Sequence, residues 1–148
     1  MYLIRLFQPK DTFPVIHLSS KVLTEHYDSG LFSYLYESSP WGFWVCEFNQ
    51  EIIGFIIGIQ FQERTGRILM IGIEKAYRKQ GIAQMLLKQI LTEFQKRFLT
   101  IIELEVKTTN KTAITFYQKN HFKIEERIPH FYQNGDDAYL MKRVLPTH

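Results

Sequence analysis

The chain has 148 residues, and its 18 Lys and Arg against 15 Asp and Glu give a formal net charge of +3. Hydrophobic residues make up 45% and charged residues 22%, which is typical of a globular protein and argues against disorder. The length favours one domain over residues 1–148. The basic residues are scattered, so the charge suits an anionic ligand but does not indicate a nucleic-acid-binding domain.

Cysteine content and hydropathy bear on the compartment. Cys46 is the one cysteine of the sequence, which predicts neither a disulfide framework nor a cysteine-based metal site. The histidines show no ligand spacing, so we expect no metal. The longest apolar run, Ile52 to Ile59, is far shorter than the ~18 residues of a membrane span. The first ten residues are typical of neither a signal peptide nor a transit peptide. We therefore expect a cytoplasmic protein without a membrane partner.

Apolar periodicity and turn residues predict eleven elements in chain order. The first six are a strand over 2–7, a helix from a cap at Asp11 to about Tyr27, a short helix over 31–36, and strands over 43–48, 52–61 and 68–73. The other five are a helix over 82–96, a strand over 100–107, a short helix capped by Asn110, and strands over 122–127 and 138–144. This order predicts a mixed sheet with helices on both faces.

The segment between the strand over 68–73 and the next helix carries a candidate anion site. It ends in Arg-x-x-Gly-x-Ala, from Arg78 to Ala83. A helix start offers unpaired backbone N–H groups and a positive dipole end, which suit a phosphate or pyrophosphate. Gly81 would let the backbone approach such a group closely. The pattern is neither a P-loop nor a dinucleotide fingerprint. By themselves these residues fit a tight strand-to-helix turn with a solvated Arg78 equally well.

Two residues further along are candidates for proton transfer. Glu105 has apolar neighbours on its predicted strand, where desolvation would raise the pKa of its carboxyl towards that of a useful general base. Tyr117, on the following helix, offers a hydroxyl proton. Strands often carry one solvent-facing Glu and helix tyrosines usually pack, so taken alone both residues favour a structural interpretation.

Four motifs in the right order resemble those of the GNAT acetyltransferase superfamily, and more narrowly of the protein N-terminal acetyltransferases. The similar families are the bacterial ribosomal-protein-alanine type and the archaeal and eukaryotic NatA catalytic-subunit type. The motifs are Leu23 to Tyr27, Arg78 to Ala83, Leu104-Glu105-Val106 with Asn110, Ala113 and Tyr117, and His130 to Met141. The resemblance implies the GNAT fold, an α/β (α+β mixed) domain with a central mixed, mostly antiparallel sheet and helices on both faces.

The resemblance also implies acetyl-CoA as cosubstrate, with no metal. In such enzymes a strand backbone pairs with the pantetheine arm, the signature loop cradles the pyrophosphate, and an asparagine contacts the cosubstrate near its thiol. The residues implied here are Ile71, Gly72, Ile73, Arg78, Lys79, Gln80, Gly81, Ile82, Ala83, Gln84 and Asn110.

By the same resemblance, Glu105 is the general base, directly or through water, and Tyr117 is the general acid for the departing CoA thiolate. Glu25, Tyr27 and Tyr132 would line the groove that receives the substrate's first residues. Arg67 stands where some archaeal relatives carry a histidine that shares the base role, which leaves Glu105 as the stronger candidate.

The implied substrates are the N-termini of proteins or peptides, with ribosomal proteins or the ribosome among the implied partners, and the implied state is a monomer or weak dimer. Other interpretations stay open. A GNAT enzyme could instead acetylate a small amine or a lysine side chain. The chain could also be a non-catalytic acetyl-CoA-binding module, although the intact Glu105 and Tyr117 argue against this.

Overall fold

The computed structural model describes residues 1–23 and 28–146. Glu25 and Tyr27, which we predicted for the substrate groove, lie outside the described residues. Contacts divide the chain into two compact units, and strands β3 (Glu51–Gln62) and β4 (Thr65–Ile73) contribute residues to both. Unit 1 is Met1–Ile59 with Ile68–Arg97, and unit 2 is Gln60–Arg67 with Phe98–His148. A single domain over the whole chain stays a prediction.

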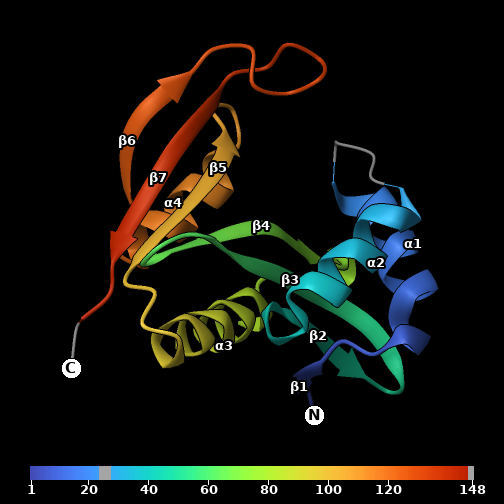
Figure 1. Cartoon of the computed structure of the whole chain (residues 1–148). Coiled ribbons are helices and arrows are strands. Elements are labelled where there is room, and N and C mark those ends of the chain that lie inside the picture. Colours follow the sequence, from blue (N-terminus) through green and yellow to red (C-terminus); the bar gives the residue numbers. More distant parts are fainter. Residues whose placement is uncertain (24–27, 147–148) are drawn as a thin grey trace. The chain divides into compact units, whose positions relative to one another are not determined.

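The described elements follow the predicted order (Figure 1). The α-helices and strands up to residue 97 are β1 (Leu3–Leu6), α1 (Thr12–Val22), α2 (Ser29–Ser38), β2 (Phe43–Phe48), β3 (Glu51–Gln62), β4 (Thr65–Ile73) and α3 (Ile82–Lys96). Those that follow are β5 (Ile101–Lys107), α4 (Lys111–Lys119), β6 (Lys123–Ile128) and β7 (Ala138–Val144). No helix in the described part of the chain is long and apolar enough to cross a membrane.

The sheet confirms the predicted mixed, mostly antiparallel architecture. Its strand order is β1-β2-β3-β4-β5-β7-β6. The pairs β1–β2, β2–β3, β5–β7 and β6–β7 are antiparallel, whereas the first residues of β4 pair with β5 in parallel. The predicted turn at Asn49 and Gln50 joins β2 to β3, and both residues have positive φ (51° and 66°), as a tight hairpin turn requires.

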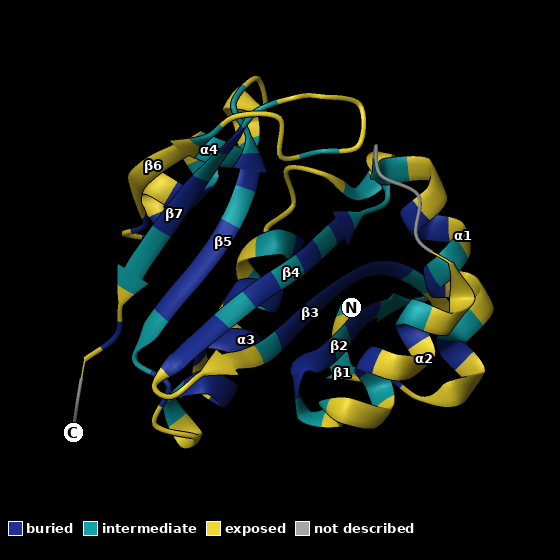
Figure 2. Cartoon of the chain, turned by 45° about the horizontal axis from the view of Figure 1, so that its top comes forward, coloured by how far each residue is buried: buried dark blue, intermediate teal, exposed yellow. Residues whose placement is uncertain are grey.

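In unit 1 the two faces of β3 are covered by different helices because successive side chains alternate between faces. Phe55 and Ile57 belong to a buried cluster with α1 and α2. The other members of that cluster are Phe7, Val15, Leu18, Phe32, Leu35, Phe43, Val45 and Met70. Gly58 faces α3, where an added Cβ would lie 2.7 Å from Ile90 and 2.8 Å from Phe94. Figure 2 shows the buried length of β3 in dark blue. The absence of a side chain at Gly58 lets α3 pack directly on the strand.

In unit 2, β7 lies between β5 and β6. Leu140 of β7 is opposite Glu105 of β5, and Met141 is opposite Ile124 of β6. Alternation along β5 places two sets of side chains on opposite faces. One set is Ile102, Leu104 and Val106, all buried, and the other is Glu103, Glu105 and Lys107. The second set holds the predicted base.

Two local predictions need correction. We expected Gly30 to end one helix before another over 31–36, but α2 begins at Ser29 because the Asp28 carboxylate accepts a hydrogen bond from the Leu31 N–H at 2.9 Å. Asp11 does lie at the N-cap position of α1, yet its side chain does not cap that helix. Its carboxylate instead accepts from the Gln8 N–H and pairs with Arg5, each at 2.8 Å.

Candidate active site

The predicted anion-binding segment lies in unit 1, between the end of β4 and the start of α3. After β4 the backbone turns through a short 3-10 helix, Lys75–Tyr77. The Arg78 Nε folds back and donates to the Ile73 carbonyl at 3.3 Å, and the Tyr2 hydroxyl donates to the Gln80 side chain. Arg78, Lys79 and Gln80 are all exposed. The segment therefore presents charged side chains to solvent next to the start of a long helix.

Gly81 is the N-cap of α3 and adopts a left-handed conformation, with φ of 83°. Within the described part of the chain no side chain caps the helix start, and a Cβ built at Gly81 would meet nothing within 4 Å. Ile82 is buried and anchors the first turn, whereas Gln84 is exposed. Backbone N–H groups at such an uncapped helix start suit a phosphate or pyrophosphate.

The end of β4 supplies the strand predicted to bind the pantetheine arm. Ile71 and Ile73 are half-buried, and Gly72 between them is buried. A Cβ at Gly72 would lie 2.7 Å from Phe55 and 2.9 Å from Val22. Packing against α1 and β3 thus explains why this position holds a glycine, whatever binds to the adjoining backbone.

The predicted general base lies in unit 2, on β5. The Glu105 side chain is 13% exposed, and burial raises the pKa of its carboxyl above the ordinary value. The positive charge of Arg67 opposes that rise and the negative charge of Glu103 adds to it. The Arg67 Nη1 lies 3.3 Å from the Glu105 Oε2. The expected cause, desolvation on an apolar strand, is therefore present.

The Tyr117 side chain, on α4, is buried between two other rings. The ring centroids of Phe116 and Phe122 lie 5.3 Å and 5.6 Å from that of Tyr117. Burial, and to a lesser extent Tyr132, raise the pKa of the Tyr117 hydroxyl well above its usual value. The hydroxyl therefore keeps its proton across the working range of pH.

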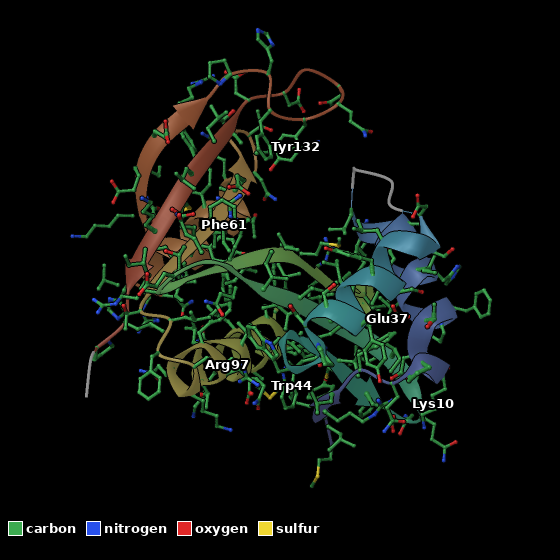
Figure 3. The ribbon with its side chains drawn as sticks, in the orientation of Figure 1. Lys10, Glu37, Trp44, Phe61, Arg97 and Tyr132 are labelled. Carbon is green, nitrogen blue, oxygen red and sulfur yellow. The ribbon has the colours of Figure 1, made fainter. Side chains whose placement is uncertain are left out.

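Tyr132 lies in the loop between β6 and β7 (Figure 3). Its backbone N–H donates to the Asp136 carbonyl at 3.1 Å, which closes a tight turn. The Lys107 ammonium, at the end of β5, lies 5.0 Å from the Tyr132 ring centroid and 3.5 Å from the Asp136 carboxylate. These contacts hold the loop against the strand that carries Glu105. The sequence analysis did not single out Lys107.

Asn110 is the N-cap of α4, as predicted. Its side-chain oxygen accepts a hydrogen bond from the Ala113 N–H at 3.1 Å. The cap orients the side chain, whose amide nitrogen and second oxygen lone pair could still contact a cosubstrate.

Unit 2 thus contains Glu105, Tyr117, Tyr132 and Asn110, and unit 1 contains the strand and loop predicted for the cosubstrate. The ion pairs of Arg67 with Glu103 and Glu105 were not predicted. Period-two spacing of those glutamates on one strand was the available signal.

Across residues 1–23 and 28–146, no group of three His, Cys, Asp or Glu is placed to hold a metal ion.

Comparisons with known proteins identify the family of the chain. The family model described as "Acetyltransferase (GNAT) family" matches residues 8–122, more than half of the chain. The crystal structure of Ard1 from Thermoplasma volcanium has a TM-score of 0.95 and 31% sequence identity, over 98% of each chain. N-alpha-acetyltransferase 30 of Schizosaccharomyces pombe is 33% identical over 84% of this chain and 86% of the relative. An N-alpha-acetyltransferase of Sulfolobus acidocaldarius is 28% identical over 97% of this chain and 93% of the relative.

Proposed function

Because the chain belongs to the GNAT acetyltransferase family, we propose that it transfers the acetyl group of acetyl-CoA to the N-terminal α-amine of proteins. The observation that carries the proposal is Glu105, a largely buried carboxylate whose pKa is raised by burial. The names of the Schizosaccharomyces and Sulfolobus relatives, both N-alpha-acetyltransferases, support the α-amine as acceptor.

The chemistry requires a base of only moderate strength. The amine must lose a proton so that its nitrogen can attack the thioester carbonyl. An α-amine has a pKa near ~8, against ~10.4 for a lysine side chain, so the α-amine is the easier of the two to deprotonate. A carboxylate with a raised pKa, acting directly or through one water, can accept that proton. Glu105 fills this role in the proposal.

Tyr117 acts on the leaving group. A thiol has a pKa of about 8.5, far below that of the buried Tyr117 hydroxyl, so complete proton transfer from Tyr117 to the thiolate would be unfavourable. A hydrogen bond donated by the hydroxyl would still stabilise the developing negative charge on sulfur. The raised pKa of the hydroxyl therefore supports a role for Tyr117 as a hydrogen-bond donor, in place of the general acid that the resemblance implies.

The unit 1 residues would bind the cosubstrate. The uncapped start of α3, with Arg78 and Lys79 exposed beside it, fits the pyrophosphate in both charge and hydrogen-bonding groups. The backbone from Ile71 to Ile73 would pair with the pantetheine arm. An N–H from the same backbone would stabilise the oxyanion that forms when the amine attacks.

The proposal also covers how the peptide substrate binds and where in the cell the enzyme acts. Tyr132, with Glu25 and Tyr27 as further candidates, would line the groove for the first residues of the substrate, because tyrosine hydroxyls can bind a peptide backbone without reading its side chains. We also propose that the enzyme acts in the cytoplasm as a monomer or weak dimer, with ribosomal proteins among its substrates.

The test is acetyl transfer to paired peptides that share one sequence with an internal lysine. One member of each pair has a free N-terminus and the other a blocked N-terminus. We expect acetylation of the free peptide only. Equal acetylation of both would make lysine the acceptor, and CoA binding without any transfer would indicate a binding module.

The same assay tests the base. Replacing Glu105 by Gln keeps its shape but removes its basicity, so turnover should fall by the ~10²–10⁴-fold typical of a lost general base, with CoA affinity unchanged. Glu125→Gln, at an exposed position of β6, is the matched control and should keep full turnover. Near-normal turnover of the Glu105 variant would refute the assignment.

A further inference from the structure

We propose that Arg67 is a positioning residue that holds the Glu105 carboxylate in one orientation and, by its positive charge, keeps that carboxylate ionised. The inference rests on the proposed function, since it concerns the base of that reaction. Arg67, on β4, would act on the reaction through its ion pair with Glu105 rather than through contact with the substrate.

The geometry is a bridge from one guanidinium to two carboxylates. The parallel register of β4 and β5 places Arg67 directly opposite Glu103, and Glu105 follows two residues later on the same face. The Arg67 Nη2 lies 2.9 Å from the Glu103 Oε1, and the Nη1 lies 3.3 Å from the Glu105 Oε2. The planar fork of the guanidinium suits this arrangement, which the single ammonium of a lysine cannot reproduce.

The guanidinium is itself held from other directions. Its central carbon lies 3.9 Å from the centroid of the Phe61 ring, on β3. Glu103 is anchored on its far side by the Lys142 ammonium of β7, at 3.3 Å. The Arg67 Nε is buried and, among the described residues, has no hydrogen-bond partner. The two ion pairs and the Phe61 ring are therefore the contacts that hold the guanidinium in place.

The charges around Glu105 explain what Arg67 adds. In unit 2 the face of β5 that carries Glu105 also carries Glu103 and Lys107. Lys107 is paired with Asp136, and Glu103 with Arg67 and Lys142. Burial and the charge of Glu103 both favour the protonated, inactive form of Glu105. Arg67 is in direct contact with Glu105, and its positive charge opposes both effects.

The test is the pH dependence of kcat/KM for a free-amine peptide, measured with folded variants. The acidic limb of that profile contains the protonation of the base and that of the peptide's α-amine, and because the peptide is the same throughout, differences between variants report the base. Arg67→Gln should move the limb to higher pH by about 1 unit, the low end of the ~1–3 units typical of an opposite charge in contact, because Glu103 shares the guanidinium. Glu103→Gln should move it the other way, to lower pH. Arg67→Lys keeps the charge and should move the limb less than Arg67→Gln.

A residue that only joined the strands would lower kcat or stability in these variants without moving the limb, and that result would overturn the inference. Carbon NMR titration of the Glu105 carboxyl in the free protein gives a second readout that needs no turnover. The pKa should rise in Arg67→Gln and fall in Glu103→Gln, and unchanged values in both would refute the proposal. Failure of the proposed function is distinguishable, because Glu105→Gln would then keep both its activity and its acidic limb.

Discussion

Gly81 and Gly135 form a matched pair for testing the cosubstrate loop. Both adopt a left-handed backbone conformation, with φ of 83° and 91°, and a Cβ built at either would meet nothing within 4 Å. Replacement by Ala therefore introduces backbone strain at both positions and a steric clash at neither. Gly81 begins α3, whereas Gly135 lies in the loop between β6 and β7.

The strain sets the expected loss of stability. A left-handed conformation costs an L-residue about 1–2 kcal/mol, which for a chain of this length lowers the melting temperature by about 3–6 °C. Gly81→Ala and Gly135→Ala should therefore lose similar stability, measured by thermal unfolding without ligand. Their affinities for CoA should differ, because only the methyl group at position 81 occupies the open space where the proposed phosphate would lie.

We expect Gly81→Ala to bind CoA at least ~10-fold more weakly in calorimetric titrations, equivalent to about 1.4 kcal/mol, with Gly135→Ala unchanged. Gly81→Val, with a bulkier side chain, should bind more weakly still. Equal CoA affinity in Gly81→Ala and the parent protein would refute the assignment of the loop. Parallel losses of affinity in both Ala variants would show that strain alone accounts for the effect.

Three further predictions concern single side chains. Tyr117→Phe should lower kcat about 10-fold by removing a hydrogen bond to the leaving thiolate. The pH profile of kcat up to pH 10 should keep its shape, because the raised pKa leaves the Tyr117 hydroxyl un-ionised, and a displaced alkaline limb would contradict this. Tyr132→Phe should raise KM for peptides whatever their first residue, while a change confined to one peptide would argue for side-chain recognition instead. Cys46 is fully buried and burial raises the pKa of its thiol to about 11, so the native protein should resist alkylation at pH 8 until it is denatured, and rapid labelling of the native form would contradict the structure.

Local sequence patterns determined several helices, turns and caps of this protein and identified its family motifs. Apolar periodicity predicted α3, which the structure confirms. The Asn49-Gln50 turn joins β2 to β3 as predicted, and Asn110 caps the start of α4 as predicted. The direction predicted for the pKa shift of Glu105 agrees with the structure, although alternation places its apolar neighbours on the opposite face of β5. The family, the fold class and the acetyltransferase activity followed from short motifs and are confirmed by the comparisons.

Tertiary structure decided what lies opposite those residues. Arg67 and Glu103 are 36 positions apart, and their ion pair depends on the parallel register of β4 and β5, which no local pattern specifies. Alternation predicted that Glu103 and Glu105 share a face, but not that one guanidinium would bridge them. Packing likewise explains why position 58 is a glycine, because α3 lies where a side chain at this position would point. Periodicity is a property of neighbouring residues, whereas register and packing arise only when distant segments meet.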